Sequence, residues 1–356
     1  MARPRIDDVA KRAGVSKTSV SFAFNKPDNL RVATRERILA AAAELGYRPS
    51  PIARGLANRR TGQLGLVVPQ STHDVFANPF LAELLRGIGD VCDREGISLV
   101  IVPPAGGSLA RAVEAALVDG LILLGLAPDH PELELARRAG VPVVALDVDA
   151  WGDADVIAVD DAFGAAAAAR HIYRLGHRDV AVVLIAEHPD AAVDEQAGIS
   201  ARRLAGIRSG FEAAMSDADG DGQAVRLRVM SAPVSEDGGR VAFAELEADG
   251  LPTAVMAITD MTAIGILNAA IDAGVRVPED LSIVGYDDIP AASWTCPRLT
   301  TVHQPIREKG RLAARRLIDL ARSPDERHPA TDVLPTRLVV RASTAPPHRG
   351  GGASRS

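Results

Sequence analysis

The feature that most constrains this chain is the spacing of apolar residues near its N-terminus, which fits two short helices separated by a glycine. One face of the first helix carries apolar side chains at positions i, i+3, i+4 and i+7, namely Ile6, Val9, Ala10 and Ala13. Gly14 follows directly, where a tight turn needs the positive φ that glycine adopts easily. Ser16 then suits the N-cap of a second helix over residues 17–24, because its hydroxyl can accept a hydrogen bond from an unpaired backbone N–H.

A third helix is predicted after a loop rich in Asn, Pro and Asp. Thr34 is expected to be its N-cap, and Gly46 is expected to end it. Two short helices joined by a glycine turn and followed by a supporting helix form a helix-turn-helix. An ordinary three-helix bundle is the alternative interpretation. The complete string from Ile6 to Val20 favours a DNA-binding helix-turn-helix domain over residues 1–49.

The second helix of such a domain lies in the major groove, with its N-terminal residues facing the base edges. The candidates for DNA contact on and beside this helix are Ser16, Lys17, Thr18, Ser21, Phe22 and Asn25. Lys17 can donate to guanine or to a phosphate, and Phe22 can pack on thymine methyl groups. Phosphate contacts position a protein without reading sequence, and the candidates for them are Arg3, Arg5, Arg31 and Arg35. Thr34 is counted with the DNA-binding residues.

Charge is distributed unevenly along the chain. Residues 1–60 hold 13 Lys and Arg against 5 Asp and Glu, a net charge of +8, whereas the whole chain has a net charge of −6. The remaining residues therefore carry a net charge of −14. A basic head on an acidic body indicates that a polyanion binds at one end of the molecule.

The 356 residues, of which 47% are hydrophobic and 24% charged, predict two or three globular domains. No apolar stretch reaches the roughly 18 residues of a membrane span, and the N-terminus lacks the apolar run of a secretory signal. We therefore expect a cytoplasmic protein. The two cysteines, Cys92 and Cys296, do not have a metal-ligand spacing.

Beyond residue 61, apolar segments of strand length alternate with amphipathic segments of helix length. Strands are predicted over residues 64–68, 99–102, 121–124, 141–146, 180–185, 254–258 and 282–285. Helices are predicted over residues 78–95, 109–118, 132–139, 162–175, 203–215 and 261–273. Continuous apolar strands between helices indicate parallel sheets covered on both faces, and two such runs indicate two lobes. The expected fold is an all-α head followed by an α/β two-lobed body.

Four aspartates, Asp147, Asp160, Asp260 and Asp287, are predicted at the carboxyl ends of strands. Ligands of such sheets bind at these strand ends, so we expect an effector site in the cleft between the lobes. A helix N-cap at a strand-to-helix turn is the alternative role for each of these carboxylates.

Other functions find little support in the sequence. Asp217–Gly222 starts like a calcium-binding loop, but Arg228 stands where the loop needs a bidentate glutamate. Nucleotide-binding and hydrolase signatures are absent, and the histidines lack a metal-binding spacing, so neither an enzyme nor a metal or cofactor site is predicted. A transport-type sugar-binding protein would fit the body, but not the DNA-binding head.

The first 70 or so residues of the chain resemble the signature of the LacI/GalR-type family of ligand-responsive transcriptional regulators. The resemblance rests on IDDVAKRAGVSKTSVS at residues 6–21 and on ATRERILAAAAELGYRPSPIARGLANRRTGQLGLVVP at residues 33–69. It implies that residues 50–60 form a hinge that becomes helical on the operator, with Leu56 as a wedge in the minor groove. Ala53 and Ala57, which flank Leu56, belong to the same implied DNA contact.

The resemblance continues through the body and implies a periplasmic-binding-protein-like fold of type I over residues 61–344. The implied first lobe covers about 61–160 and 296–328, and the second lobe covers about 161–290 and 329–344. Residues 345–356 are expected to be a disordered tail. The implied effector contacts add Phe80, Arg203 and Trp294, and they include Asp287 in the segment Gly285-Tyr286-Asp287-Asp288.

The resemblance also implies a function. A homodimer would place two recognition helices on a near-palindromic operator, and a small molecule in the body, such as a sugar or a sugar derivative, would control the binding. Repression with ligand-induced release is the commoner behaviour of the family.

Overall fold

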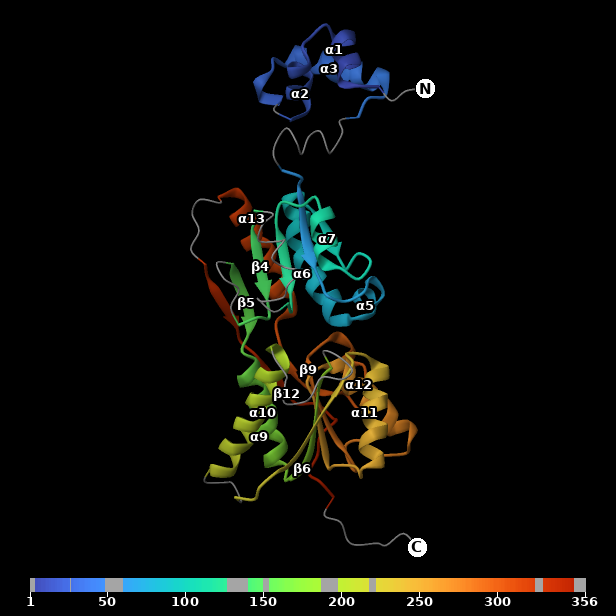
Figure 1. Cartoon of the computed structure of the whole chain (residues 1–356), viewed down its shortest axis with the longest axis vertical. Helices are drawn as coiled ribbons and strands as arrows, with labels where there is room; N and C mark the ends of the chain where they lie inside the picture. The colour runs from blue at the N-terminus through green and yellow to red at the C-terminus, as the bar shows by residue number, and fades with distance from the viewer. Residues whose placement is uncertain are drawn as a thin grey trace. The chain divides into compact units, whose positions relative to one another are not determined.

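The structure is a computed structural model that describes residues 4–25, 27–48, 60–126, 140–149, 154–186, 198–217, 222–323 and 329–348 (Figure 1). The chain divides into two compact units. The head unit covers Met1–Gln63 with Leu117–Asp119, and the body unit covers Leu64–Ala116 with Gly120–Ser356.

The head contains the three predicted helices. Its elements are α1 (Ile6–Ala13), α2 (Lys17–Asn25), the short 3₁₀ helix η1 (Pro27–Asn29) and α3 (Val32–Leu45). Gly14 and Gly46 both have φ 65°, so each ends a helix in the left-handed conformation that glycine favours. The backbone N–H of Ser19 donates to the Ser16 hydroxyl at 3.1 Å, which confirms the N-cap predicted for α2.

The cap predicted for the third helix is wrong. α3 begins at Val32 after an extended Arg31, and no side chain caps it. Thr34 lies inside its first turn, where its N–H donates to the Arg31 carbonyl at 2.9 Å. The helix extends beyond the predicted start because Val32 and Ala33 continue the helical backbone without a proline or glycine to stop it.

The body consists of two α/β lobes. The sheet of the first lobe has the order β11-β5-β4-β3-β1-β2. Its strands are β1 (Gln63–Val67), β2 (Ser98–Val102), β3 (Leu121–Leu124), β4 (Val143–Leu146), β5 (Asp155–Val159) and β11 (Thr331–Leu334), and its helices are α5 (Thr72–Ala77), α6 (Pro79–Glu95), α7 (Leu109–Ala115) and α13 (Ile306–Arg322).

The sheet of the second lobe has the order β12-β10-β9-β8-β6-β7, and only β12 is antiparallel to its neighbour among the pairings described. Its strands are β6 (Asp179–Ile185), β7 (Arg226–Ala232), β8 (Ala254–Ala257), β9 (Ser282–Asp287), β10 (Thr300–His303) and β12 (Arg337–Val339). Its helices are α9 (Asp161–Arg174), α10 (Gly198–Ser216), α11 (Glu236–Ala248), α12 (Asp260–Asp272) and the 3₁₀ helix η4 (Pro290–Ser293). Separate apolar cores lie under the α9–α10 pair and under the α11–α12 pair, so both faces of this sheet are covered.

The predicted lobe boundaries are wrong near the C-terminus. Residues 296–328 were expected in the first lobe, yet β10 belongs to the second sheet and pairs with β9. Residues 329–344 were expected in the second lobe, yet β11 pairs with β5 of the first sheet. The chain crosses between lobes after β5, after β10 and again after β11. Strand pairing over such separations is a tertiary property that a short apolar run does not specify.

The predicted tail also begins too early. Ala345 is part of the second lobe, because its N–H donates to the Ser282 hydroxyl at 3.1 Å and its carbonyl accepts from His177 Nε2 at 2.9 Å. These two bonds attach the backbone of Ala345 to the second lobe. Residues 349–356 of the predicted tail lie outside the described residues.

Helix pairs pack closely because glycine and alanine line their contacts. A Cβ on Gly87 of α6 would lie 2.1 Å from the Arg307 carbonyl oxygen at the start of α13. A Cβ on Gly206 of α10 would lie 2.4 Å from the Ala162 carbonyl oxygen of α9. Small residues therefore bring these backbones together in a chain with only 3% aromatic residues.

Across the described residues, none of the helices combines the length and the apolar character that a membrane crossing requires.

Candidate functional site

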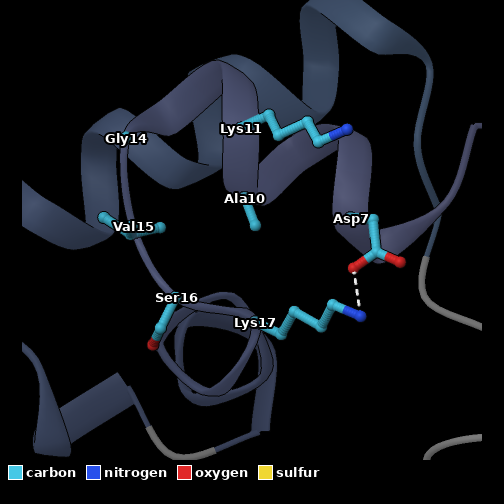
Figure 2. A pocket seen from close by; sticks show the side chains of 7 residues that line it. All are labelled: Asp7, Ala10, Lys11, Gly14, Val15, Ser16 and Lys17. Carbon is cyan, nitrogen blue, oxygen red and sulfur yellow. Dashed lines mark ion pairs between the residues drawn. The ribbon is translucent and has the colours of Figure 1, made fainter.

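The start of α2 and one face of α1 form a concave surface on the head (Figure 2). It is lined by Asp7, Ala10, Lys11, Gly14, Val15, Ser16 and Lys17. Lys17 Nζ lies 2.6 Å from Asp7 Oδ1, and both side chains are exposed. An exposed ion pair contributes about 0–1 kcal/mol, so a DNA phosphate or base can replace Asp7 as the partner of Lys17.

The other predicted DNA contacts differ in exposure. Lys17 and Thr18 are exposed at the N-terminal end of α2, as a helix that reads a groove requires. Ser21, Phe22 and Asn25 are half-buried, and the amide of Asn25 donates to the Ser21 hydroxyl at 3.2 Å. This bond holds both polar groups within α2.

Among the predicted phosphate contacts, Arg5, Arg31 and Arg35 are exposed on the head. Thr34 is half-buried in α3. The predicted hinge contacts Ala53, Leu56 and Ala57, together with Arg3, lie outside the described residues.

In the body, polar side chains from both lobes meet at the carboxyl ends of β4 and β9. We call this set the inter-lobe cluster; it comprises Asp147, Asp161, Arg202, Arg203, Asp287, Gln304 and Lys309. Three of these were predicted from the sequence: Asp147, Arg203 and Asp287.

The first-lobe end of the cluster is centred on Asp147. Lys309 Nζ, on a side chain with 0% exposure, donates to Asp147 Oδ1 at 2.5 Å and to Gln304 Oε1 at 2.8 Å. The same ammonium lies 5.5 Å from the centroid of the Phe80 ring, in the first turn of α6. The predicted residues Phe80 and Asp147 are thus connected by a lysine that the sequence analysis did not single out.

The second-lobe end is centred on Arg203. Its Nε donates to Asp161 Oδ1 at 2.8 Å, its Nη1 donates to the Ile258 carbonyl at 2.5 Å, and the guanidinium stacks 3.6 Å from the Tyr286 ring centroid. Burial alone would raise the pKa of Asp161, but the adjacent Arg203 and Arg202 guanidinium groups hold that pKa below its usual range. With a side chain that is only 4% exposed, Arg203 is a buried member of this cluster and does not form a surface ion pair.

Asp287 connects the two ends. Its Oδ1 accepts from Gln304 Nε2 at 2.6 Å and lies 3.5 Å from Arg203 Nη1. Burial raises the pKa of Asp287 to about 6, although Arg203 and Gln304 favour the charged form. Through Gln304, this carboxylate is linked to Lys309 in the other lobe.

Asp160 and Asp260 have structural partners instead. Asp160 caps α9, accepting from the Phe163 N–H at 3.0 Å, which is the alternative role considered for it. Asp260 is fully buried; its Oδ1 accepts from the Thr301 hydroxyl at 2.5 Å and its Oδ2 accepts from the Ile289 N–H at 2.9 Å. Burial also raises the pKa of Asp260 well above its usual range.

Trp294 was expected to form a wall of the effector site. It follows η4 and is 78% exposed, and none of the inter-lobe contacts described above involves it. The structure therefore does not bring Trp294 to the inter-lobe cluster.

A groove of about 460 Å³ borders the crossover from β10 to α13. Gln304 lines it together with Glu83, Asp288, His303, Arg307 and Arg341, and none of the predicted effector residues does. Asp288 pairs there with His303 Nδ1 at 2.9 Å and with Arg341 Nη2 at 2.5 Å. Consecutive aspartates thus face different partners, Asp287 in the inter-lobe cluster and Asp288 in the groove.

Four members of the inter-lobe cluster were missed from the sequence. Asp161 and Arg202 are adjacent to predicted residues, and Gln304 lies in the string His303-Gln304-Pro305, so neighbouring signals existed for these three. Lys309 gave no signal, because a lysine near the start of an amphipathic helix is normally solvated.

Comparisons with known proteins find relatives of both the head and the body of this chain. Residues 5–50 match the family model described as bacterial regulatory proteins, lacI family, and residues 169–344 match a periplasmic binding protein-like domain. The chain is 33% identical over 351 residues to the HTH-type transcriptional regulator CelR of Thermobifida fusca, covering 96% of this chain and 98% of that protein.

Two solved structures are similar over most of the chain. A complex of the transcriptional regulator CelR with cellobiose has a TM-score of 0.67 and 31% identity, covering 96% of this chain and 100% of that one. The lac repressor dimer bound to operator and the anti-inducer ONPF has a TM-score of 0.78 and 27% identity, covering 97% of this chain and 100% of that one.

Proposed function

Because the chain belongs to the LacI family of bacterial transcriptional regulators, we propose that it is a cytoplasmic repressor that binds a near-palindromic operator as a homodimer and that a sugar or sugar derivative releases it. The observation that carries this proposal is the inter-lobe cluster, in which side chains of both lobes offer carboxylate, amide and guanidinium groups within one hydrogen-bonded set. A ligand that bonds to groups on both lobes changes their relative arrangement, which is what control of a dimeric DNA-binding protein needs.

The charges of the cluster favour an uncharged, hydroxyl-rich effector. Each of its three cations, Arg202, Arg203 and Lys309, already has a carboxylate partner within 3.0 Å. An anionic ligand would therefore meet no unpaired positive charge in the cluster, whereas hydroxyl groups can both donate to the carboxylates and accept from the guanidinium groups. The cellobiose complex of CelR supports a sugar as the first ligand to test.

The head supports operator binding through the exposed start of α2. Lys17 and Thr18 are the proposed base contacts, Arg5 and Arg31 the proposed phosphate contacts, and Leu56 of the hinge the proposed minor-groove wedge. In a symmetric dimer, the half-sites lie about 34–36 Å apart, so the operator is expected to be a near-palindrome.

The test begins with the full chain and sheared genomic DNA of its source organism. The retained fragments are sequenced, and enrichment of one near-palindrome with a flexible pyrimidine–purine step at its centre is the expected result. A labelled copy of that site is then titrated with protein in the presence of cellobiose or ribose, and release of DNA by one of them supports the effector proposal. Absence of any enriched site, with and without these sugars, would contradict the proposed operator function.

A Thr18→Ala variant tests the proposed base contact in the same assay, with unrelated DNA as the control. Thr18 is exposed on α2, so its replacement leaves the head folded and lowers affinity for the enriched site more than for unrelated DNA. An equal loss on both DNAs would assign Thr18 to the backbone of the duplex instead of the bases.

A further inference from the structure

Arg202 of the second lobe makes direct polar contacts with the first lobe. It lies in the first turns of α10, and its guanidinium makes three hydrogen bonds. Nε donates to Asp161 Oδ2 of its own lobe at 3.0 Å. Nη2 donates to the Asp147 carbonyl at 3.0 Å and Nη1 donates to Asp149 Oδ1 at 2.8 Å, and both acceptors follow β4 of the first lobe.

The planar guanidinium is what allows this arrangement. Its N–H groups point in fixed directions, so one nitrogen can hold Asp161 while the other two reach across to the first lobe. A lysine in the same place would offer a single charged centre. We call the contacts of Arg202 with Asp147 and Asp149 the Arg202 bridge.

The bridge is coupled to Arg203 through a shared carboxylate. Asp161 accepts a hydrogen bond from Arg202 at Oδ2 and one from Arg203 at Oδ1, so one buried carboxylate orients both guanidinium groups. Arg203 in turn reaches Asp287 at 3.5 Å. Breaking the Arg202 bridge would therefore leave Asp161 and Arg203 in place within the second lobe, but would remove the connection from α10 to the end of β4.

We propose that Arg202 is a positioning residue that holds the two lobes of the body together through its bonds to Asp147 and Asp149. Its bonds join elements of different lobes, while its anchor, Asp161, is buried in the second lobe. We call the arrangement in which the Arg202 bridge is formed closed, and the arrangement in which it is broken open. The bridge raises the fraction of closed molecules, and it thereby fixes how Asp147 and Arg203 are placed when a ligand arrives. This last consequence rests on the proposed effector function.

The proposal is tested by measuring the distance between the lobes in the full chain without ligand or DNA. Spin labels are placed through Glu114→Cys on α7 and Val241→Cys on α11, two exposed positions in different lobes, after Cys296→Ser removes the exposed native thiol; the other cysteine, Cys92, is buried. Labelled chains are mixed with an excess of unlabelled protein, so that pulsed dipolar spectroscopy reports distances within one chain even in a dimer.

Arg202→Met is expected to lower the ratio of closed to open molecules about tenfold, seen as a longer and broader distance distribution, because charge-assisted hydrogen bonds across the cleft are lost. Asp149→Ala removes only a 76% exposed acceptor and cannot disturb a core, and it is expected to shift the ratio in the same direction by about two- to threefold. Arg240→Met is the matched control, because Arg240 pairs with Asp272 within the second lobe and is expected to leave the distribution unchanged.

A distribution for Arg202→Met and Asp149→Ala that matches the parent would overturn the proposal, and so would an equal shift in Arg240→Met. Calorimetric titration with cellobiose is the second readout, and a tenfold weaker affinity in Arg202→Met is expected if cellobiose binds the parent. If the parent binds neither cellobiose nor ribose and retains no operator, the proposed function fails, while the distance measurement still decides the role of Arg202.

Discussion

Replacement of Lys309 by methionine tests the inter-lobe cluster through its one ammonium. Lys309 is fully buried in the first turn of α13, and its partner Asp147 is 5% exposed. Methionine keeps most of the length and volume of lysine but removes the charge and both hydrogen bonds that Lys309 Nζ donates. The Asp147 carboxylate and the Gln304 Oε1 atom would then lose a donor at 2.5 and 2.8 Å.

The magnitude follows from burial. Removing one partner of a buried ion pair leaves an uncompensated charge and costs about 3–5 kcal/mol, whereas replacing both partners by neutral groups is often close to neutral. Lys309→Met should therefore destabilise the body by about 3–5 kcal/mol. The double variant Lys309→Met with Asp147→Asn should recover at least about 2 kcal/mol of that loss, because no charge is left buried without a partner.

The assay is urea unfolding followed by tryptophan fluorescence at one fixed protein concentration. Both tryptophans of the sequence, at positions 151 and 294, come after the three head helices in the chain, so the head itself contains no tryptophan. Arg315→Met in the same helix is the control for loss of a cationic side chain. If the double variant is no more stable than Lys309→Met alone, the buried pair is not the source of the loss and the reasoning is refuted.

Three further predictions concern the packing, the titration and the DNA contact. Gly87→Ala should destabilise the body by about 1–3 kcal/mol, because the added Cβ would overlap the Arg307 carbonyl. Gly89→Ala in the same helix places its Cβ in open space and should stabilise the body by up to about 1 kcal/mol. Thermal unfolding of the two variants measures this difference, and equal stabilities would contradict it. The pKa of Asp287 is about 6 in the folded protein and near 4 in the unfolded chain, so the folded state binds an extra proton between these values. The contribution of Asp287 to stability should therefore fall by on the order of 2–3 kcal/mol as pH rises from 4 to 6. Asp260, whose pKa burial also raises, adds to the fall, so Asp287→Asn should reduce the slope in urea unfolding across this range without abolishing it, and an unchanged slope would reject the shift. Asp7→Asn frees Lys17 from its ion pair and should tighten operator binding about two- to fivefold in fluorescence anisotropy at low salt, while unchanged or weaker binding would show that Asp7 does not compete with DNA.

Local signals predicted the head and most of the body. The i, i+3, i+4, i+7 spacing and the glycines after each helix depend only on neighbouring residues, and the structure places α1, α2 and the end of α3 as predicted. The family resemblance and the fold class are confirmed by the comparisons. The start of α3 was misplaced because threonine was preferred as a cap, whereas Arg31 precedes a helix that needs no side-chain cap.

Long-range pairing was beyond the sequence. β10 and β11 are four-residue strands, and nothing in Thr300–His303 or Thr331–Leu334 specifies which of two similar sheets each will join. The role of Lys309 was hidden for the same reason, since its burial depends on α6, β4 and the crossover at Gln304 meeting in space. The roles of the predicted effector and DNA contacts remain predictions, although Arg203, Asp147 and Asp287 do meet as expected.

The backbone gives independent support for where the site lies. Within the described ranges, the non-glycine residues with positive φ are Asp147, Asp287 and Asp288, at 60°, 121° and 56°. Such conformations cost of order 1–3 kcal/mol each and persist where surrounding contacts hold them, commonly at functional sites. All three follow or end the strands β4 and β9, and their carboxylates are held by Lys309, Gln304 and Arg341 respectively. A fold that needed only rigidity could use glycine at these turns, so the use of aspartate favours a role for the carboxylates that goes beyond shaping the chain. Since Asp147 and Asp287 belong to different lobes, this strain is concentrated where relative movement of the lobes would be sensed.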